Sequence, residues 1–175
     1  HSVLLTYEPG GTAIGDAVRQ TLMDLVNTGM EPETEFLLFS ASRAQLVRER
    51  IRPHLDAGGV VVCDRYYDSS IAYQGYGHRL DLQALRAITA FATGSLAPDL
   101  TLLLDLPAGE GLNRRRQHGE WNRLDAYDLE FHTRVRDGYH ALAAAEPQRW
   151  VTIDAARDIE QIQADVQRAV AARLP

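Results

Sequence analysis

Short apolar runs alternate with helical patterns along the chain. There are four of these runs, and a polar or acidic residue follows each of them: residues 3–5, 60–63, 102–104 and 151–153. Continuous apolar runs without alternation are typical of strands that are covered on both faces, as in a parallel sheet. The pattern therefore predicts four parallel strands.

Apolar positions recur at helical spacing between the runs and after the last one. They predict helices over residues 15–26, 33–51, 82–92, 129–145 and 158–174. Strands that alternate with helices predict an α/β domain with a doubly wound parallel sheet. We expect one domain over residues 1–175, because a chain of this length buries a core without a second unit.

Ligands of open parallel sheets bind beyond the carboxyl ends of the strands. The apolar runs place Glu8, Asp64, Arg65 and Asp105 at that edge. The segment 107–128 is the least regular and the richest in arginine. We expect it to form a mobile loop or short helices over the site, as a lid.

Composition and charge narrow the possible partners. The net charge of −6 and the pI near 5.5 argue against a nucleic acid as main partner, because such binders present a basic face. A small anionic substrate needs only a local positive cluster.

No apolar stretch is long enough to span a membrane and no secretion signal is present, so we expect a cytoplasmic protein without a membrane partner.

The first candidate motif, Tyr7-Glu8-Pro9-Gly10-Gly11-Thr12, directly follows the first apolar run. Paired glycines allow a sharp turn and a close approach to a ligand, but any strand-to-helix turn favours the same residues. Both interpretations stay open. Arg19 follows one or two helical turns later and could face the same site.

The second motif, Phe39 and Arg43, lies within an expected helix. Four residues separate them, so both side chains leave one helix face and could meet a planar ligand by stacking and hydrogen bonding. Spacing alone favours the simpler interpretation, a core phenylalanine beside a solvated arginine.

The third motif follows the second apolar run. Asp64 could hold Mg²⁺ through water, and Arg65 could clamp a phosphate. Hydroxyl, phenol and amide groups then line the following turn, contributed by Ser69, Ser70, Tyr73 and Gln74. So many polar side chains favour a ligand site over a structural Asp-Arg ion pair.

The fourth motif is the arginine cluster from Arg114 to Arg123. Phosphoryl transfer depends on in-line placement and on neutralising charge on the phosphoryl oxygens, which arginines on a closing lid can do. A solvated basic surface is the alternative interpretation.

Together these motifs resemble the ordered motif series of bacterial thymidylate kinases. The matching segments are Tyr-Glu-Pro-Gly-Gly-Thr from Tyr7, Leu-Leu-Phe-Ser-Ala-Ser-Arg-Ala-Gln from Leu37, Asp-Arg-Tyr-Tyr-Asp-Ser-Ser-Ile-Ala-Tyr-Gln-Gly from Asp64, Pro-Asp-Leu-Thr-Leu-Leu-Leu-Asp from Pro98, and the lid ending Arg123-Leu124-Asp125. The resemblance covers nearly the whole chain. It implies a three-layer P-loop kinase-like fold and a homodimer that phosphorylates dTMP to dTDP with ATP and Mg²⁺, for dTTP synthesis.

The resemblance also implies roles for individual residues. Phe39 would stack on thymine, Arg43 would bond its exocyclic oxygen, and Arg65 would grip the dTMP phosphate. The whole implied dTMP site comprises Glu8, Pro9, Arg19, Phe39, Arg43, Arg65, Ser69, Ser70, Tyr73 and Gln74. The implied catalytic residues are Asp64, which places magnesium through water, Arg65, and the lid residues Arg114, Arg116 and Arg123. No covalent intermediate is implied.

Two features depart from the family pattern. Tyr7 stands where the family normally has arginine. The chain also has no Gly-x-x-x-x-Gly-Lys-Ser/Thr loop for ATP phosphates, and its 18 basic residues are all arginine. In relatives that loop follows a strand upstream of the segment beginning at His1, so we expect a missing strand, loop and helix on the order of 25 residues.

That missing strand should lie in the middle of the sheet. Two alternative functions stay open beside dTMP kinase. One is a nucleotide-binding module without catalysis, and the other is a kinase for another nucleoside monophosphate.

Overall fold

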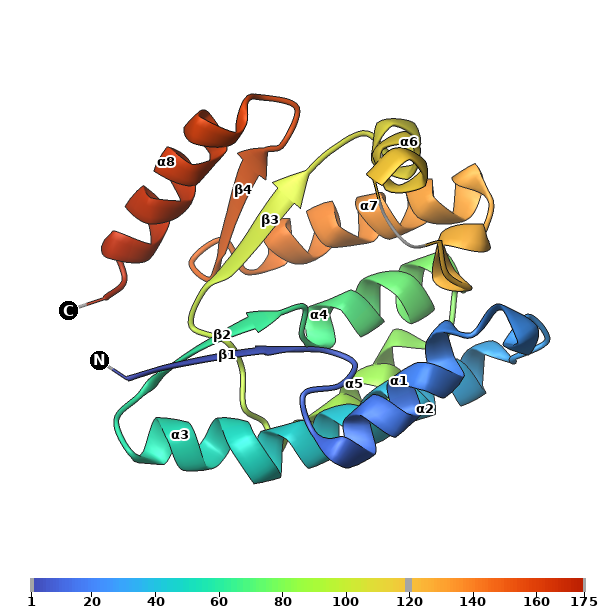
Figure 1. Cartoon of the computed structure of the whole chain (residues 1–175), viewed down its shortest axis with the longest axis horizontal. Coiled ribbons are helices and arrows are strands. Elements are labelled where there is room, and N and C mark those ends of the chain that lie inside the picture. Colours follow the sequence, from blue (N-terminus) through green and yellow to red (C-terminus); the bar gives the residue numbers. More distant parts are fainter. Residues whose placement is uncertain (1, 119–120, 175) are drawn as a thin grey trace.

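A computed structural model describes residues 2–118 and 121–174, and Figure 1 shows their arrangement. The strands are β1 (Val3–Tyr7), β2 (Val60–Asp64), β3 (Thr101–Asp105) and β4 (Trp150–Asp154). Each contains one of the continuous apolar runs, so the four predicted strands are confirmed. The expected α/β architecture, parallel strands flanked by helices, is confirmed too.

The strands form two parallel pairs. β1 pairs with β2, with Leu5 opposite Val62, and β3 pairs with β4, with Leu103 opposite Thr152. Among the described residues no strand joins β2 to β3, so the parallel strands form two separate halves. The two pairs are seen one above the other in Figure 1.

Helices cover these strands (Figure 1). They are α1 (Ala13–Met23), α2 (Pro32–Leu46), α3 (Arg52–Asp56), α4 (Tyr67–Ser70), α5 (Leu82–Thr93), α6 (Ala108–His118), α7 (Leu129–Ala145) and α8 (Ile159–Ala171), with the short 3-10 turns η1 (Leu25–Asn27) and η4 (Leu124–Ala126). The π-helical turn η2 (Val47–Ile51) joins α2 to α3, and η3 (Ile71–Gly77) continues α4. All five predicted helices are present, although the one expected over residues 33–51 continues into α3.

Helix boundaries follow local chemistry. The side chains of Thr12, Asp81 and Asp128 cap α1, α5 and α7 by accepting hydrogen bonds from backbone N–H groups of the first turns. Pro32 occupies the first turn of α2, where a missing N–H costs nothing. Gly94 ends α5 at φ 59°, a left-handed conformation that glycine adopts without strain.

Two segments are more helical than the sequence indicated. We expected a polar turn after Asp64, but residues 67–77 form α4 and η3, because Ile71 and Ala72 enter the main core on one face of a helix. The predicted lid, residues 107–128, contains α6 and η4. Gly119 and Glu120 of that lid lie outside the described residues.

The main hydrophobic core holds α7, η3, α5 and β4 together. Its buried residues are Phe36, Ile71, Ala72, Leu85, Phe131, Val135, Leu142 and Trp150. A second cluster of Leu46, Val47 and Ile51 lies against β2 through Val61 and Cys63. Both clusters fix the helices that reach the carboxyl ends of β1, β2 and β3, where the polar side chains gather.

None of the described helices combines the length and the apolar character that crossing a membrane requires.

Candidate functional site

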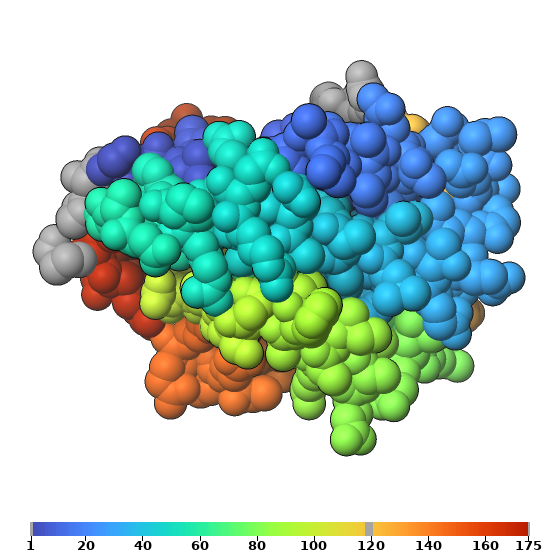
Figure 2. All heavy atoms as spheres, turned by 90° about the horizontal axis from the view of Figure 1, so that it is seen from below, coloured from blue at the N-terminus to red at the C-terminus, as the bar shows by residue number. Residues whose placement is uncertain are grey.

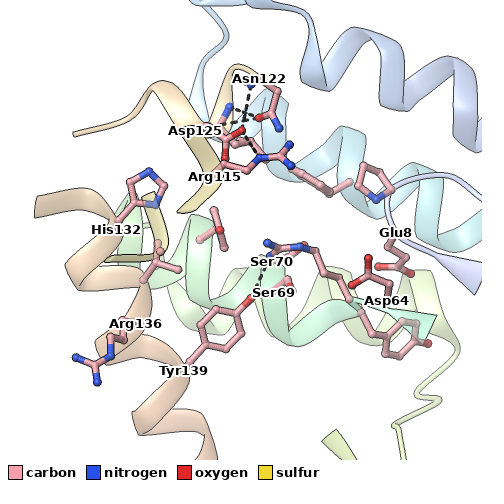
Figure 3. A pocket seen from close by; sticks show the side chains of 18 of the residues that line it. Glu8, Asp64, Ser69, Ser70, Arg115, Asn122, Asp125, His132, Arg136 and Tyr139 are labelled. Atoms are coloured by element: carbon pink, nitrogen blue, oxygen red, sulfur yellow. Dashed lines mark hydrogen bonds and ion pairs between the residues drawn. The ribbon is translucent and has the colours of Figure 1, made fainter. Parts of the chain in front are cut away.

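A cavity of about 610 Å³ opens at the carboxyl ends of the strands. It extends from Asp64 at the end of β2 to Leu103, Leu104 and Asp105 of β3, so it lies between the two strand pairs. Figure 3 shows side chains that line it. Every residue of the expected dTMP site lines it: Glu8, Pro9, Arg19, Phe39, Arg43, Arg65, Ser69, Ser70, Tyr73 and Gln74. The structure thus brings Phe39, Arg43 and Arg65 to one shared cavity.

The turn between β1 and α1 depends on its glycines. Gly10 and Gly11 have φ angles of 131° and 77°, which side chains rarely adopt. A Cβ atom on Gly11 would lie 2.5 Å from Thr6 Oγ1. The Gly10 N–H donates to Ser42 Oγ at 3.0 Å and the Gly11 N–H to Asp16 Oδ1 at 3.0 Å. This tight turn holds Glu8 at the cavity wall.

A buried ion pair lies at the base of the cavity. Arg43, 1% exposed, donates from Nε to Glu8 Oε2 at 2.7 Å and from Nη2 to Ser70 Oγ at 2.9 Å. Burial raises the pKa of Glu8 to about 6, although the charge and hydrogen bond of Arg43 oppose the change. Glu8 Oε1 has no hydrogen-bond partner among the described residues.

Two other polar atoms at this wall also lack partners among the described residues. They are Arg43 Nη1, a donor, and Gln74 Oε1, an acceptor. Buried polar groups are normally hydrogen-bonded, so these atoms indicate where a ligand would complete the network. A donor and an acceptor from two residues that line one cavity suit a planar ligand edge that carries both groups.

Arg65 reaches the cavity from the end of β2. Its φ of 65° is unusual for a residue with a side chain, and such outliers concentrate at functional sites. Its guanidinium lies 5.3 Å from the ring centre of Tyr73, and Nη1 makes a long contact of 3.4 Å with Tyr139 Oη. Burial raises the pKa of Tyr139 to about 12, so its hydroxyl keeps its proton and donates to Ser69 Oγ at 2.8 Å.

The carboxylate of Asp64 is the candidate magnesium ligand. Glu8 N donates to Asp64 O at 2.9 Å, and the two carboxylates stand beside each other in Figure 3. The described residues contain no cluster of three His, Cys, Asp or Glu that could hold a metal. Mg²⁺ commonly binds one or two carboxylates together with substrate phosphates and waters, so the site fits Mg²⁺ brought with a nucleotide.

The lid presents a different arginine from those that the sequence indicated. Arg115 lines the cavity and donates from Nε to Asp125 Oδ2 at 3.0 Å, whereas Arg114 and Arg116 are not among the lining residues. Arg114 donates to Ala155 O at 2.9 Å and pairs with Glu110 of its own helix. The Arg116 guanidinium lies 5.1 Å from the ring centre of Trp121.

Arg123 is not a lining residue of the cavity either. It is 3% exposed, and its three guanidinium nitrogens contact Leu22 O, Tyr127 Oη and Glu35 Oε2 at 2.9, 2.9 and 2.5 Å. In this arrangement Arg123 joins the base of the lid to α1 and α2, through Leu22 and Glu35.

Residues of α7 complete the cavity, and sequence reasoning did not single them out. His132, Arg136 and Tyr139 line it. Arg136 donates from two nitrogens to the Asp105 carboxylate, both at 2.8 Å, and His140 Nε2 lies 3.1 Å from Asp105 Oδ1. The Arg136 hydrogen bond and the nearby His140 lower the pKa of Asp105. The sequence did contain a signal for these residues, because the spacing of positions 132, 136 and 139 places them on one face of a helix.

Fold and site together define a class: an α/β protein with an arginine-lined cavity at the carboxyl ends of its parallel strands, where ligands of such folds bind. The family model described as thymidylate kinase matches residues 1–166. The chain belongs to the thymidylate kinase family.

Named relatives agree with this assignment. The thymidylate kinase of Roseiflexus sp. (strain RS-1) is 55% identical over 172 residues, which cover 91% of this chain and 76% of the relative. The thymidylate kinase of Roseiflexus castenholzii is 53% identical and covers 97% of this chain and 80% of the relative. That of Deinococcus radiodurans is 52% identical and covers 99% and 84%.

Proposed function

We propose that the chain binds dTMP and that the enzyme phosphorylates it to dTDP with ATP and Mg²⁺, in the supply of dTTP. One observation carries the proposal: in a chain of the thymidylate kinase family, an aromatic ring and two guanidinium groups, from Phe39, Arg43 and Arg65, line one cavity. A flat base and a phosphate joined by a sugar need such groups at opposite ends of one site.

The pyrimidine end of the proposed site consists of Phe39, Arg43, Ser70 and Gln74. The half-buried Phe39 ring stacks on the base. Arg43 Nη1 donates to an exocyclic carbonyl oxygen, and Gln74 Oε1 accepts from the adjacent ring N–H. The two atoms without partners among the described residues support this placement.

The phosphate end consists of Arg65 with Arg19, Glu8 and Pro9. Arg19 Nη1 donates to Pro9 O at 2.9 Å, so the turn that carries Glu8 also orients a second cation. Arg65 grips the dTMP phosphate and holds its oxygen in line for transfer, without a covalent intermediate. Mg²⁺ held by Asp64 through water would neutralise charge on the phosphates.

The lid is proposed to close over the phosphates of ATP. Arg115 already lines the cavity, and Arg114 and Arg116 of the same helix would reach the phosphates if the lid moves on closure. A module that binds a nucleotide without catalysis is the second candidate function, because the residues that line the cavity already account for the base and the phosphate of a nucleoside monophosphate.

Calorimetry on this chain separates the candidates. We expect dTMP to bind more tightly than dCMP or dGMP, and a purine preference would contradict the roles of Phe39 and Arg43. Coupled assays of ADP release with dTMP, on a chain extended by the strand, glycine-rich loop and helix of a related thymidylate kinase, then test for catalysis. Binding of dTMP without turnover would support the binding module, and binding of no pyrimidine nucleotide would overturn both.

We also propose a homodimer that packs through α2 and α5. These helices contact each other and lie side by side on the face shown in Figure 2. Leu37 of α2 is 52% exposed and Phe91 of α5 is 81% exposed. Large apolar side chains exposed on neighbouring helices suit a subunit interface.

A further inference from the structure

A buried carboxylate lies behind the pyrimidine wall of the cavity. Glu35, in α2, is 0% exposed and is not a lining residue. Its Oε1 accepts from Gln74 Nε2 at 2.6 Å and lies 3.3 Å from His78 Nε2. Its Oε2 accepts from the Tyr127 hydroxyl at 3.0 Å and pairs with Arg123. Burying a charged carboxylate costs free energy unless ion-pair and hydrogen-bond partners replace the water that it loses.

The Glu35 carboxylate stays ionised. Burial raises its pKa, but hydrogen bonds from His78 and Gln74 and the charge of Arg123 outweigh burial and lower the pKa to about 2. An ionised carboxylate has no proton to donate, so it accepts hydrogen bonds only. The amide group of Gln74 must therefore turn its NH₂ toward Glu35.

That orientation determines which atom of the Gln74 amide is left to bind a ligand. Its amide oxygen, an acceptor, is left without a partner among the described residues, and Gln74 is one of the residues that line the cavity. Gln74 lies four residues after Ser70, which holds Arg43, so acceptor and donor lie on neighbouring parts of one wall. Thymine and uracil present C=O beside N–H to such a wall, whereas cytosine presents NH₂ beside an unprotonated ring nitrogen.

We propose that Glu35 is a positioning residue that sets pyrimidine selectivity by fixing the Gln74 amide with its oxygen toward the base. The inference rests on the proposed function, because it assumes that a pyrimidine occupies this wall. Arg123 and Tyr127, from the base of the lid, keep Glu35 charged and in place. Glu35 itself does not touch the ligand.

The test replaces the carboxylate by an amide that can donate as well as accept. In Glu35→Gln the Gln74 amide can turn over, so the ratio of dTMP to dCMP affinity should fall about tenfold or more, the size of one hydrogen bond in a buried site. Isothermal titration calorimetry with each nucleotide measures the ratio. Glu49→Gln is the matched control, because exposed Glu49 also accepts from a glutamine, Gln45 Nε2 at 2.7 Å, on a helix surface.

Glu35→Gln leaves the Arg123 charge buried without its partner and could unfold the chain. The double variant Glu35→Gln/Arg123→Met removes both charges, and circular dichroism melting reports whether it folds. We expect the double variant to lose selectivity as well. A folded variant with the wild-type ratio would overturn the role of Glu35 while leaving the proposed function intact. A wild-type chain that binds neither nucleotide would instead overturn the proposed function.

Discussion

Two arginines reach the cavity from different elements, and their contacts suit them to bind different parts of a ligand. Arg43 is held on two sides by Glu8 and Ser70, which leaves one nitrogen for a ligand. In the described part of the chain the Arg65 guanidinium contacts the Tyr73 ring and the Tyr139 hydroxyl but pairs with no carboxylate, so it is available to an anion. A held donor suits a neutral base edge, and an available cation suits a phosphate.

Replacing Arg65 by methionine should therefore affect the phosphate and spare the base. Hydrogen bonds to charged groups contribute about 1.5–3 kcal/mol, so we expect Arg65→Met to weaken dTMP binding by about 10- to 100-fold. Affinity for thymidine, which has no phosphate, should stay unchanged. Calorimetry with both ligands measures this. Arg79→Met is the control, because Arg79 also has a positive φ, 62°, but does not line the cavity. Equal losses for both ligands would contradict the assignment.

Glu8 makes stability depend on pH. Its pKa is about 6 in the folded chain against 4.5 for an ordinary Glu, so the folded state binds the proton more tightly. The free energy of unfolding then contains a contribution that is full below pH 4.5 and is lost as pH rises through 6. Between pH 5 and 7.5 this loss amounts to about 1 kcal/mol.

Urea unfolding of the wild type and of Glu8→Gln at both pH values checks the prediction. The wild type should lose stability relative to the variant as pH rises. Glu35, with a pKa of about 2, does not titrate in this range. All other side chains are the same in both chains, so their contributions cancel in the comparison. A difference that stays constant from pH 5 to 7.5 would show that Glu8 does not carry the effect.

At the scale of elements, the turn between β1 and α1 combines backbone strain with crowding. Gly11→Ala would place a Cβ atom 2.5 Å from Thr6 Oγ1 and 2.9 Å from Leu46 Cδ1 at a φ of 77°. We expect it to lower the free energy of unfolding by about 2 kcal/mol or more. Gly29→Ala is the control, since a Cβ there meets no atom within 4 Å. Thermal unfolding compares them, and equal melting temperatures would contradict the assigned strain.

Elements were predictable where one physical signal decided them. Continuous apolar runs defined the four strands, and capped periodic segments such as the one that begins after Asp128 defined the helices. The helix after Asp64 was missed, because its polar residues face the cavity and leave little apolar periodicity. In α6, Arg114, Arg115 and Arg116 leave the helix about 100° apart, so composition could not tell which of them lines the cavity.

At the scale of the whole molecule, the exposed face of α2 and α5 predicts self-association. Phe91→Asp should weaken a dimer formed through this face at least tenfold, because a charge there loses its water on association. Light scattering coupled to size-exclusion chromatography over a concentration series measures it. Val26→Asp, at a position that is 79% exposed on η1, should leave the mass unchanged. A wild-type chain that is monomeric at all concentrations would contradict the proposed dimer.

The separation of the two strand pairs predicts which additional segment would provide a binding site for ATP. In the described residues, β2 pairs with β1 alone and β3 with β4 alone, so each has one edge without a strand partner, and the cavity lies between them. Unpaired strand edges leave backbone N–H and C=O groups without ladder partners. A parallel strand between β2 and β3 would pair with both of these edges. A glycine-rich loop after it would open at the cavity, where the carboxyl ends of all strands meet.

We therefore expect this chain to bind dTMP but not ATP in calorimetry. A chain extended at its N-terminus by the strand, glycine-rich loop and helix of a related thymidylate kinase should bind both and melt at a higher temperature. An extension whose loop lysine is replaced by methionine separates the two effects, since it should keep the higher melting temperature and lose ATP affinity. Equal ATP affinity with and without the extension would show that ATP is held by residues already present, and Arg115 would then be the first to test.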